Sequence, residues 1–205
     1  MVLYFKKING KDYKKTNNIN SIHIKGGNMI ESRKRLKTKV IIENAMAHLL
    51  QKCPFDQITT VQLVKAAGIS RSSFYTHYKD KYEMIERYQE QIFHQLEEIF
   101  NRYIDNQREA MIHSFHLLKE QPLVVALLSD NRTKEIQNFL RLKLQILLTD
   151  DIHKRLGGKD LTPIEVDYTA VYLTNAYFGV CQTWLARGTQ EAPEEIADFL
   201  MKMMW

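Results

Sequence analysis

The amino-acid sequence predicts an all-α fold of about nine helices, and three observations support this prediction. Apolar residues recur at spacings of three and four along nearly the whole chain, which is the period of a helix packed on one face. Only four prolines interrupt the 205 residues, and they fall at the ends of the periodic segments. Serine, threonine and aspartate, which cap helix N-termini, stand directly before several of those segments.

The first helix is predicted over residues 33–51. Its apolar side chains follow the i, i+3, i+4, i+7 rule and form one stripe: Ile42, Ala45, Met46 and Leu49. Pro54 ends this helix, because the residue before a proline is pushed out of the helical region.

The second helix is short and carries local signals at both ends. Thr59 and Gln62 form a capping box at its start, in which each side chain bonds the backbone N–H of the other residue. The helix runs to Ala67 and stops at Gly68, because glycine readily takes the left-handed conformation that closes a helix.

The third and fourth helices also begin at capping residues. Ser70 caps a third helix over residues 71–78, and Asp80 caps a long fourth helix that begins at Lys81. The second and third helices, joined by the tight turn at Gly68, have the lengths and connection of a helix-turn-helix motif.

The chain from residue 81 onward is predicted to form six helices. Thr162 and Glu165 form a second capping box, with Pro163 at the first helical position. Gly188 ends that helix, and Pro193 opens the last one. The predicted ranges are 81–105, 107–119, 122–129, 132–156, 163–187 and 193–203.

Residues 1–28 are predicted to be a leader outside the fold. They hold six lysines, five asparagines and little periodicity, so they cannot bury a core. The run Lys25-Gly26-Gly27 before Met29 reads like a translated ribosome-binding site, which suggests that the native start is Met29. The alternative is a genuine basic arm that adds non-specific affinity for phosphate.

Charge is divided unevenly along the chain. Residues 29–81 hold ten basic and four acidic residues, a formal charge of +6, whereas residues 82–205 hold 13 basic and 19 acidic residues, a charge of −6. A basic front half joined to an acidic rear half favours a polyanion as the partner of the front half. On charge alone, a solvated charged surface without a partner is the alternative.

The polar residues of the third helix are hydrogen-bond donors without a carboxylate among them. Phe74 and Tyr78 can face the first helix, which leaves the polar set toward solvent: Arg71, Ser72, Ser73, Tyr75, Thr76 and His77. In a helix-turn-helix that reads DNA, residues near the start of the second helix approach the base edges. Arginine can pair bidentately with guanine, while serine and threonine read less strictly.

Residues 58–81, ITTVQLVKAAGISRSSFYTHYKDK, resemble the DNA-binding signature of TetR/AcrR-type bacterial transcriptional regulators. The shared pattern consists of Ala67-Gly68-Ile69-Ser70, Ser73, Phe74-Tyr75, His77-Tyr78 and Lys81. Tyr78 in place of the commoner Phe and Pro54 in place of the usual Gly depart from it. The resemblance covers about residues 33–82. It implies a DNA-binding domain at residues 29–80 and a helical effector-binding and dimerisation domain at residues 81–205.

The resemblance also implies roles for the reading residues. Phosphate contacts fall to Tyr75, His77 and Lys81, and approaches to bases fall to Arg71, Ser72, Ser73 and Thr76. Thr60, at the start of the second helix, completes the expected DNA-binding set. Two alternatives stay open: a packing corner without a DNA role, and a co-activator of the same fold that acts through a protein partner.

By the same resemblance, the chain is expected to be a homodimeric repressor that leaves a near-palindromic DNA operator when a small-molecule effector binds. Candidate effector-lining residues are Phe115, Phe139, Ile146, Tyr172, Tyr177 and Phe178. Candidate dimer residues form two stripes on the last two long helices: Tyr168, Tyr172, Ala176, Val180 and Trp184, and then Ile196, Phe199, Leu200 and Met203. For both sets the alternative is ordinary core packing, because most apolar stripes at helical spacing are core.

No pattern in the sequence indicates an enzyme, a cofactor or a metal site. GxGxxG, P-loop, HExxH and GxSxG motifs do not occur. His113 and His116 lack a cysteine or carboxylate at fixed spacing, so they are predicted to face solvent separately. The longest apolar run, residues 123–128, is far short of the roughly 20 residues of a membrane span. Two distant cysteines form no disulfide framework, which favours a cytoplasmic location.

Overall fold

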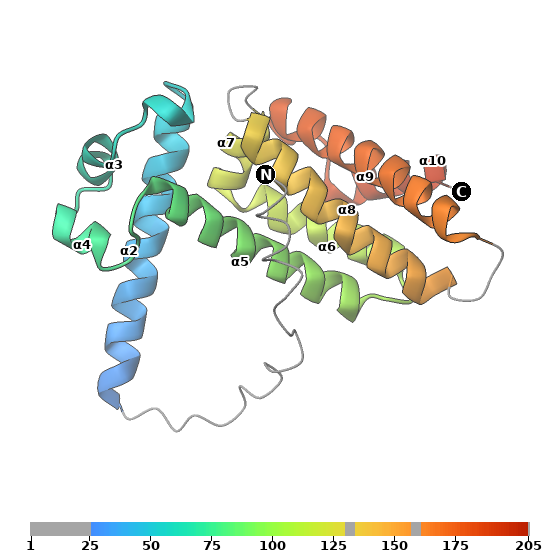
Figure 1. Cartoon of the computed structure of the whole chain (residues 1–205), viewed down its shortest axis with the longest axis horizontal. Helices are drawn as coiled ribbons and strands as arrows, with labels where there is room; N and C mark the ends of the chain where they lie inside the picture. The colour runs from blue at the N-terminus through green and yellow to red at the C-terminus, as the bar shows by residue number, and fades with distance from the viewer. Residues whose placement is uncertain (1–25, 130–133, 157–160, 205) are drawn as a thin grey trace. The chain divides into compact units, whose positions relative to one another are not determined.

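The computed structural model describes residues 26–129, 134–156 and 161–204, which form an all-α fold (Figure 1). Nine α-helices and one short 3-10 helix make up the regular structure of these ranges, with no strand among them, as the sequence predicts. The bounds are α2 Gly26–Leu50, η1 Phe55–Gln57, α3 Thr60–Ala66, α4 Arg71–Tyr75, α5 Lys81–Arg102, α6 Gln107–Lys119, α7 Pro122–Ser129, α8 Lys134–Leu156, α9 Pro163–Ala186 and α10 Pro193–Met204.

Residues 39–204 belong to one compact unit, and the part of α2 before Lys39 belongs to a separate one. Below, "the reader" means residues 39–80, and "the bundle" means helices α5–α10. In the described ranges no helix is both long and apolar enough to cross a membrane.

The start of α2 differs from the sequence prediction. The helix begins at Gly26 rather than at residue 33, so residues 26–28 of the expected leader are helical. Glycine and asparagine are poor helix formers, and nothing in the local sequence explains this early start. The remaining leader, residues 1–25, lies outside the described residues.

The end of α4 also differs, because this helix stops at Tyr75 instead of continuing to residue 78. The carbonyl oxygen of Phe74 accepts hydrogen bonds from the backbone N–H groups of both His77, at 2.9 Å, and Tyr78, at 3.0 Å. One carbonyl bound by two successive N–H groups marks a tightening last turn. The chain then turns toward Asp80.

The predicted N-terminal caps are present. Gln62 N–H donates to Thr59 Oγ1 at 3.2 Å, and Thr59 N–H donates to Gln62 Oε1 at 2.8 Å, which completes the capping box of α3. Ser70 Oγ accepts from the N–H of Ser73 at 3.1 Å. Asp80 Oδ1 accepts from the first turn of α5, with both N–H groups within 2.9 Å. Three short-range signals therefore place α3, α4 and α5.

One hydrophobic core runs through the reader and the bundle. The apolar stripe of α5 is buried in full: Met84, Tyr88, Ile92, Leu96 and Phe100. All but Phe100 belong to a single buried cluster, which extends from Ile42 of α2 to Leu200 of α10. Burying an aliphatic side chain of this size stabilises the fold by roughly 1.5–3 kcal/mol. The reader and the bundle are therefore joined by apolar packing along α5.

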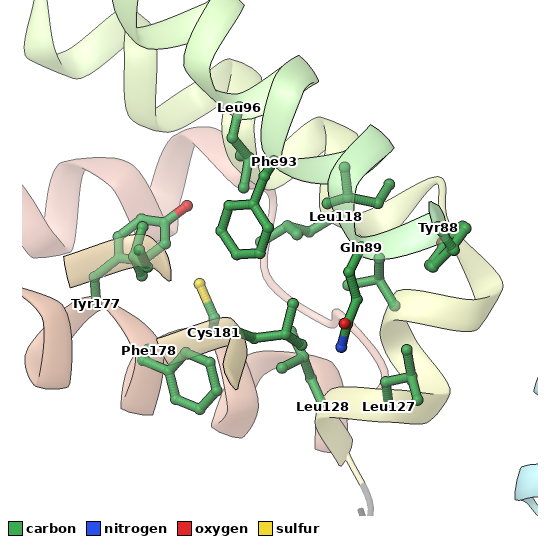
Figure 2. Close-up of a pocket in the computed structure, with 14 residues that line it drawn as sticks. Tyr88, Gln89, Phe93, Leu96, Leu118, Leu127, Leu128, Tyr177, Phe178 and Cys181 are labelled. Carbon is green, nitrogen blue, oxygen red and sulfur yellow. The ribbon is translucent and has the colours of Figure 1, made fainter. Parts of the chain in front are cut away.

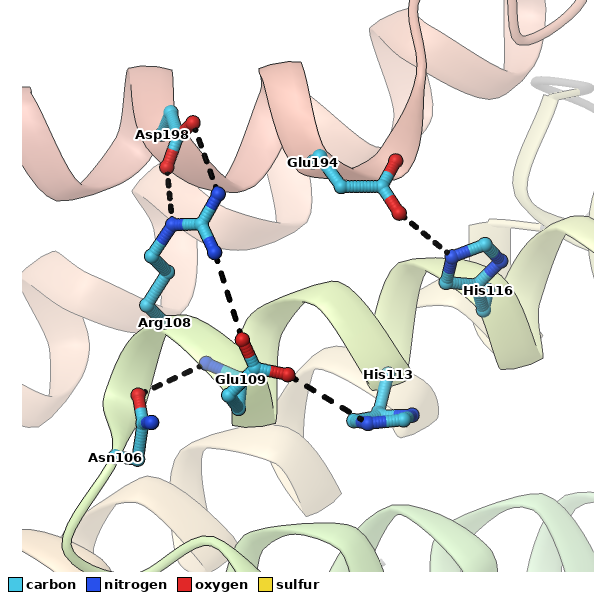
Figure 3. Close-up of polar contacts among 7 residues, drawn as sticks. All are labelled: Asn106, Arg108, Glu109, His113, His116, Glu194 and Asp198. Atoms are coloured by element: carbon cyan, nitrogen blue, oxygen red, sulfur yellow. Dashed lines mark hydrogen bonds and ion pairs between the residues drawn. The ribbon is translucent and has the colours of Figure 1, made fainter.

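Within the bundle, α8 lies beside α9, α7 packs on α9, and α10 packs on α6 (Figure 1). Polar contacts accompany the α6–α10 packing (Figure 3). The guanidinium of Arg108 donates to both carboxylate oxygens of Asp198, at 2.6 and 3.1 Å, and His116 Nε2 lies 3.2 Å from Glu194 Oε1. Exposed ion pairs contribute at most about 1 kcal/mol each. Buried Ala197 and Leu200 therefore hold α10 in place more than these pairs do.

Candidate nucleic-acid interface and ligand cavity

The turn between α3 and α4 has the hydrogen bonds of a Schellman motif. Gly68 has a φ of +64°, its N–H donates to the carbonyl of Lys65, and the N–H of Ile69 donates to the carbonyl of Val64. The positive φ explains why glycine stands here, since other residues strain to adopt it. The turn sets the angle at which α4 leaves α3.

The segment of α4 and the residues just after it has one buried apolar face and one exposed polar face. Phe74 and Tyr78 are buried and pack ring against ring at 5.7 Å. The polar residues lie outward: Arg71, Ser72, Tyr75 and Thr76 are exposed, and Ser73 and His77 are partly exposed. All six predicted α4 residues are thus on or near one accessible surface. We name it the reading surface.

The hydroxyl groups of the reading surface are partly held by local bonds. The Oγ atoms of Ser70 and Ser72 are 3.1 Å apart, and Thr76 Oγ1 donates to the carbonyl of Ser73 at 2.7 Å. These contacts fix side-chain directions before any ligand arrives. Within the described ranges, Arg71 has neither a hydrogen bond nor an ion pair, so its guanidinium remains available for a ligand.

Thr60 is the first residue of α3 and is partly exposed. The DNA-binding role expected for Thr60 stays a prediction.

Lys81 requires a correction, because the structure buries the side chain that was expected to contact phosphate. Only 8% of Lys81 is exposed. Its ammonium group donates to the carbonyl oxygens of Phe55 at 2.8 Å, Asp56 at 3.0 Å and Ile58 at 2.7 Å. An ammonium has three protons, and all three are used here.

The surroundings of Lys81 explain how the cation is accommodated. Its Nζ lies 4.7 Å from the ring centroid of Phe55 and 5.1 Å from that of Tyr82. Burial lowers the pKa of Lys81, and the nearby carboxylate of Asp56 opposes this shift. The lysine therefore joins η1 to the start of α5. No local pattern in the sequence signals this role, because Phe55 lies 26 positions before Lys81.

The sequence-predicted site set omits an exposed basic segment of α2. Arg33, Lys34, Arg35 and Lys37 are all exposed, and within the described ranges none forms an ion pair. Their charge is part of the +6 of residues 29–81, but no sequence motif marks these four residues as DNA-binding.

The bundle contains an apolar cavity of about 40 Å³ (Figure 2). Residues of α5, α6, α7, α8 and α9 line it, and none of them is charged. Of the predicted effector residues, Tyr177 and Phe178 line this cavity. The hydroxyl groups of Tyr177 and Ser114 are 2.7 Å apart, and burial raises the pKa of Tyr177 well above its usual value. Burial also raises the pKa of the Cys181 thiol to about 12, so the lining is neutral.

Three of the other predicted effector residues, Phe115, Ile146 and Tyr172, do not line the cavity. Phe115 is fully buried, but it packs against Tyr177 and Trp184, with ring centroids 5.3 and 5.2 Å away. Ile146 and Tyr172 are exposed on the surface of the bundle, because their positions on α8 and α9 point away from the core. The side chain of Phe139 lies outside the described residues.

The predicted dimer stripes divide into exposed and buried members. Tyr168, Tyr172, Phe199 and Met203 are exposed, and Ala176, Val180 and Ile196 are partly exposed. Sequence reasoning missed two further exposed apolar residues on α9, Ile164 and Val171. Together these nine residues form what we call the outer apolar face.

The predicted dimer role of Trp184 and Leu200 is wrong, because the side chains of both lie in the core of the subunit. Trp184 is 2% exposed, its ring meets Phe115 edge to face, and its Nε1–H donates to the carbonyl of Glu191 at 3.0 Å. Leu200 is buried with it in the main cluster. Neither side chain is available to a second subunit in this structure.

The helix-turn-helix reader, joined through α5 to a helical bundle with an apolar cavity, defines a class of helix-turn-helix regulators. Two family models match the chain. "Bacterial regulatory proteins, tetR family" covers residues 41–88, and "Transcriptional regulator C-terminal region" covers residues 105–204. The chain belongs to the TetR family of bacterial transcriptional regulators, as its sequence pattern predicts. Members of this family are transcription factors and not enzymes.

Individual proteins give a more limited comparison. The nucleoid occlusion factor SlmA of Colwellia psychrerythraea is 30% identical over 77 residues, which are 38% of this chain. The chain spans about two fifths of the length of that relative, 39%. A TetR transcriptional regulator from Streptococcus agalactiae is 26% identical, with a TM-score of 0.58, and the match covers 86% of this chain and 98% of that one.

The structure of the dihydroxyacetone kinase operon activator DhaS is 18% identical, with a TM-score of 0.57. The match covers 81% of this chain and 93% of that one. At this identity the likeness concerns the fold alone.

Proposed function

We propose that this protein is a homodimeric repressor that binds a near-palindromic DNA operator and is released by a small-molecule effector. The observation that carries the DNA-binding part is the reading surface of α4, which presents hydrogen-bond donors and no carboxylate. Such a face suits the acceptor-rich edges of the major groove and the phosphates beside it.

The roles of the reading residues follow from their positions. Arg71, Ser72 and Ser73 lie in the first turn of α4, the part that approaches base edges in this motif, and Thr76 is one turn further on. Tyr75 and His77 are proposed to contact phosphates, and Thr60, the first residue of α3, completes the proposed DNA-binding set. Lys81 is left out of this set because its three protons are bound to carbonyl groups.

Dimerisation is proposed through the outer apolar face of α9 and α10. Aromatic residues and methionine are enriched in interfaces, and a monomer rarely exposes so many large apolar side chains together. A symmetric pair would carry two copies of α4. DNA reading requires these copies to lie about 34–36 Å apart, one turn of duplex, on a palindromic site.

Effector release is proposed to act through α5. This helix begins at the reader and lines the cavity with residues of its third to fifth turns. An effector shifts the equilibrium between two states only by its difference in affinity for them. An effector that enlarges the cavity and moves α5 would change the spacing of the two reading helices.

Repression is the simplest consequence of operator occupancy, because a bound protein excludes polymerase without a further contact. The cytoplasm, where bacterial DNA lies, is the proposed location. The co-activator alternative requires a protein partner instead of DNA.

Arg71→Ala is the sharpest test of the proposal. Fragments of the source genome are selected with the purified protein at two salt concentrations, and binding to the enriched site is then measured. Arg71→Ala is expected to cost about 1–3 kcal/mol and to relax preference at one base position. Arg102→Ala removes the same charge from an exposed site at the end of α5 and serves as the control.

Enrichment of one palindromic site that survives higher salt would support the repressor. Binding that is blind to sequence and lost in salt would contradict it and favour the co-activator. Unchanged affinity and preference in Arg71→Ala would remove this residue from base reading. A reporter gene behind the enriched site decides between repression and activation.

A further inference from the structure

Gln89 of α5 has a buried amide group that lacks a partner at the wall of the cavity. The residue is 5% exposed, and within the described ranges its Nε2 has no hydrogen-bond acceptor. Figure 2 shows its side chain reaching from α5 toward Leu127 and Leu128 of α7. Leaving such a group unpaired in the interior is unfavourable, so a buried unpaired amide suggests a ligand that completes it.

Two other buried or partly buried glutamines, Gln137 and Gln182, have amide Nε2 groups that are hydrogen-bonded within the protein. Gln137 Nε2 donates to the carbonyl of Leu127 at 3.0 Å. Gln182 Nε2 donates to the carbonyl of Leu128 at 3.2 Å and to Gln137 Oε1 at 3.0 Å. These bonds use the carbonyl groups at the end of α7. Gln89 lies beside the same helix without such a bond.

Water is a poor partner for Gln89 in this cavity. A buried water needs two to four polar partners, and apolar cavities tend to stay dry. The other polar side chains of the lining are engaged elsewhere. The hydroxyl of Tyr88 donates to Gln121 Oε1 at 3.4 Å, that of Tyr177 pairs with Ser114, and the Cys181 thiol bonds the Tyr177 side chain. A water at Gln89 would therefore face apolar side chains on its remaining sides.

The lining and volume of the cavity also restrict the charge and polarity of the ligand. No charged side chain lines it, so an ionic group would lose its hydration without compensation. One amide NH2 group surrounded by leucine, phenylalanine and isoleucine calls for an acceptor oxygen on an apolar body. At about 40 Å³ the space is smaller than the roughly 150 Å³ that holds benzene. Binding must therefore displace lining side chains.

We propose that the cavity takes an uncharged, mainly apolar molecule with one hydrogen-bond acceptor, such as a ketone or ester carbonyl, and that Gln89 binds this acceptor. The inference rests on the proposed function in treating this cavity as the effector site. Gln89 lies eight residues after the first residue of α5, about 12 Å along the helix. An anchored ligand therefore acts on the helix that leads to the reader.

The test compares two probes of equal size on the full-length protein. Cyclohexanone carries a carbonyl oxygen, and methylenecyclohexane replaces it with a carbon. Affinities are measured by protein-observed NMR titration. The wild-type protein is expected to bind the ketone roughly 2- to 10-fold more tightly than the hydrocarbon. Gln89→Leu is expected to lose or reverse this preference.

Gln95→Leu is the matched control. Gln95 is on the same helix and also has a buried amide atom without a partner, but it does not line the cavity. This variant is expected to keep the ketone preference. Gln89→Met provides a second variant if Gln89→Leu fails to unfold cooperatively.

Failure to bind either probe, equal binding of both by the wild type, or a preserved preference in Gln89→Leu and Gln89→Met would each overturn the inference. Operator binding is followed in parallel. Selective binding without release from DNA would keep the Gln89 inference and overturn the effector part of the proposed function.

Discussion

Lys81 shows how one buried cation can organise a junction between two elements. Its ammonium binds three carbonyl groups at η1 and just after it, while its own residue begins α5. A positive charge at a helix N-terminus is unfavourable by itself. The three acceptors and two aromatic rings offset that cost. The side chain therefore stabilises the attachment of α5 to the reader.

Lys81→Met is expected to destabilise the folded state by about 1.5–3 kcal/mol, because three buried carbonyl groups lose a charged donor. Urea unfolding measures this loss. The salt dependence of operator binding should keep its slope, since no phosphate contact is removed. A slope lowered by about one would instead restore Lys81 as a phosphate ligand. Lys79→Met, at an exposed position, is the control for stability.

Glu43 of α2 predicts a pH dependence of stability. Burial raises the pKa of this carboxyl to about 7, and Lys39 one turn earlier opposes the shift. The charge of Glu43 in turn contributes to the raised pKa values of Tyr78 and Tyr88. The folded pKa lies above the ordinary 4.5, so folding favours the protonated form. This stabilisation is complete below pH 4.5 and is lost as the pH rises to about 7.

The free energy of unfolding is therefore expected to fall between about pH 4.5 and pH 7 by about 1–2 kcal/mol from this group, because its partial exposure to solvent screens the full effect. Glu43→Gln should remove that part of the fall, and Glu90→Gln, on the exposed side of α5, should leave it intact. Identical pH profiles for wild type and Glu43→Gln would show that Glu43 titrates normally. Denaturant unfolding at several pH values provides the measurement.

At the scale of elements, the turn between α3 and α4 depends on the backbone of Gly68. A Cβ placed there would meet no atom within 4 Å, so any cost of substitution comes from the positive φ alone. Gly68→Ala is expected to lower stability by about 1–2 kcal/mol, as measured by thermal unfolding. Gly179→Ala, within α9 and equally uncrowded, should be neutral or stabilising. Equal losses in both would contradict the backbone argument.

The sequence predicts those elements best that depend on neighbours a few residues away. Thr59, Ser70 and Asp80 cap their helices as expected, because each bond spans only two or three residues. The role of Lys81 depends on Phe55, 26 positions earlier, and no local pattern shows that distance closing. Helical periodicity likewise places Trp184 and Tyr172 on one stripe. Periodicity cannot show that Trp184 is buried in the core of the subunit while Tyr172 is exposed to solvent.

The candidate site divides in the same way. The reading surface follows from the helix-turn-helix spacing, and its residues lie where the pattern puts them. The cavity depends on how five helices pack. Of the five expected lining residues whose side chains the structure describes, only Tyr177 and Phe178 are found there. Gln89 was not expected, because a single polar residue on an apolar stripe carries no periodic signal.

At the scale of the whole molecule, the outer apolar face predicts a dimer. One charge introduced into this face is expected to dissociate the dimer into monomers. Tyr172 is 63% exposed at the centre of the α9 stripe. Tyr172→Glu is expected to shift the protein to a monomer in sedimentation analysis and to weaken binding to a palindromic site, because a buried unpaired charge is unfavourable. Leu142→Glu places the same charge on an exposed apolar position of α8 and should leave the dimer intact. A monomeric wild type would contradict the proposed assembly.

The continuous core along α5 bears on the construction of hybrid regulators. Met84, Ile85 and Tyr88 belong to the same buried cluster as Ile42 and Phe74 of the reader. A graft that joins a foreign reader at Asp80 would therefore pack the apolar surface of the foreign reader against α5 side chains that fit the native reader. Moving the splice to a point between Ile85 and Tyr88 carries Met84 and Ile85 with the reader and keeps Tyr88, which lines the cavity, with the bundle. Biosensors that combine one protein's operator with this protein's cavity should be joined there.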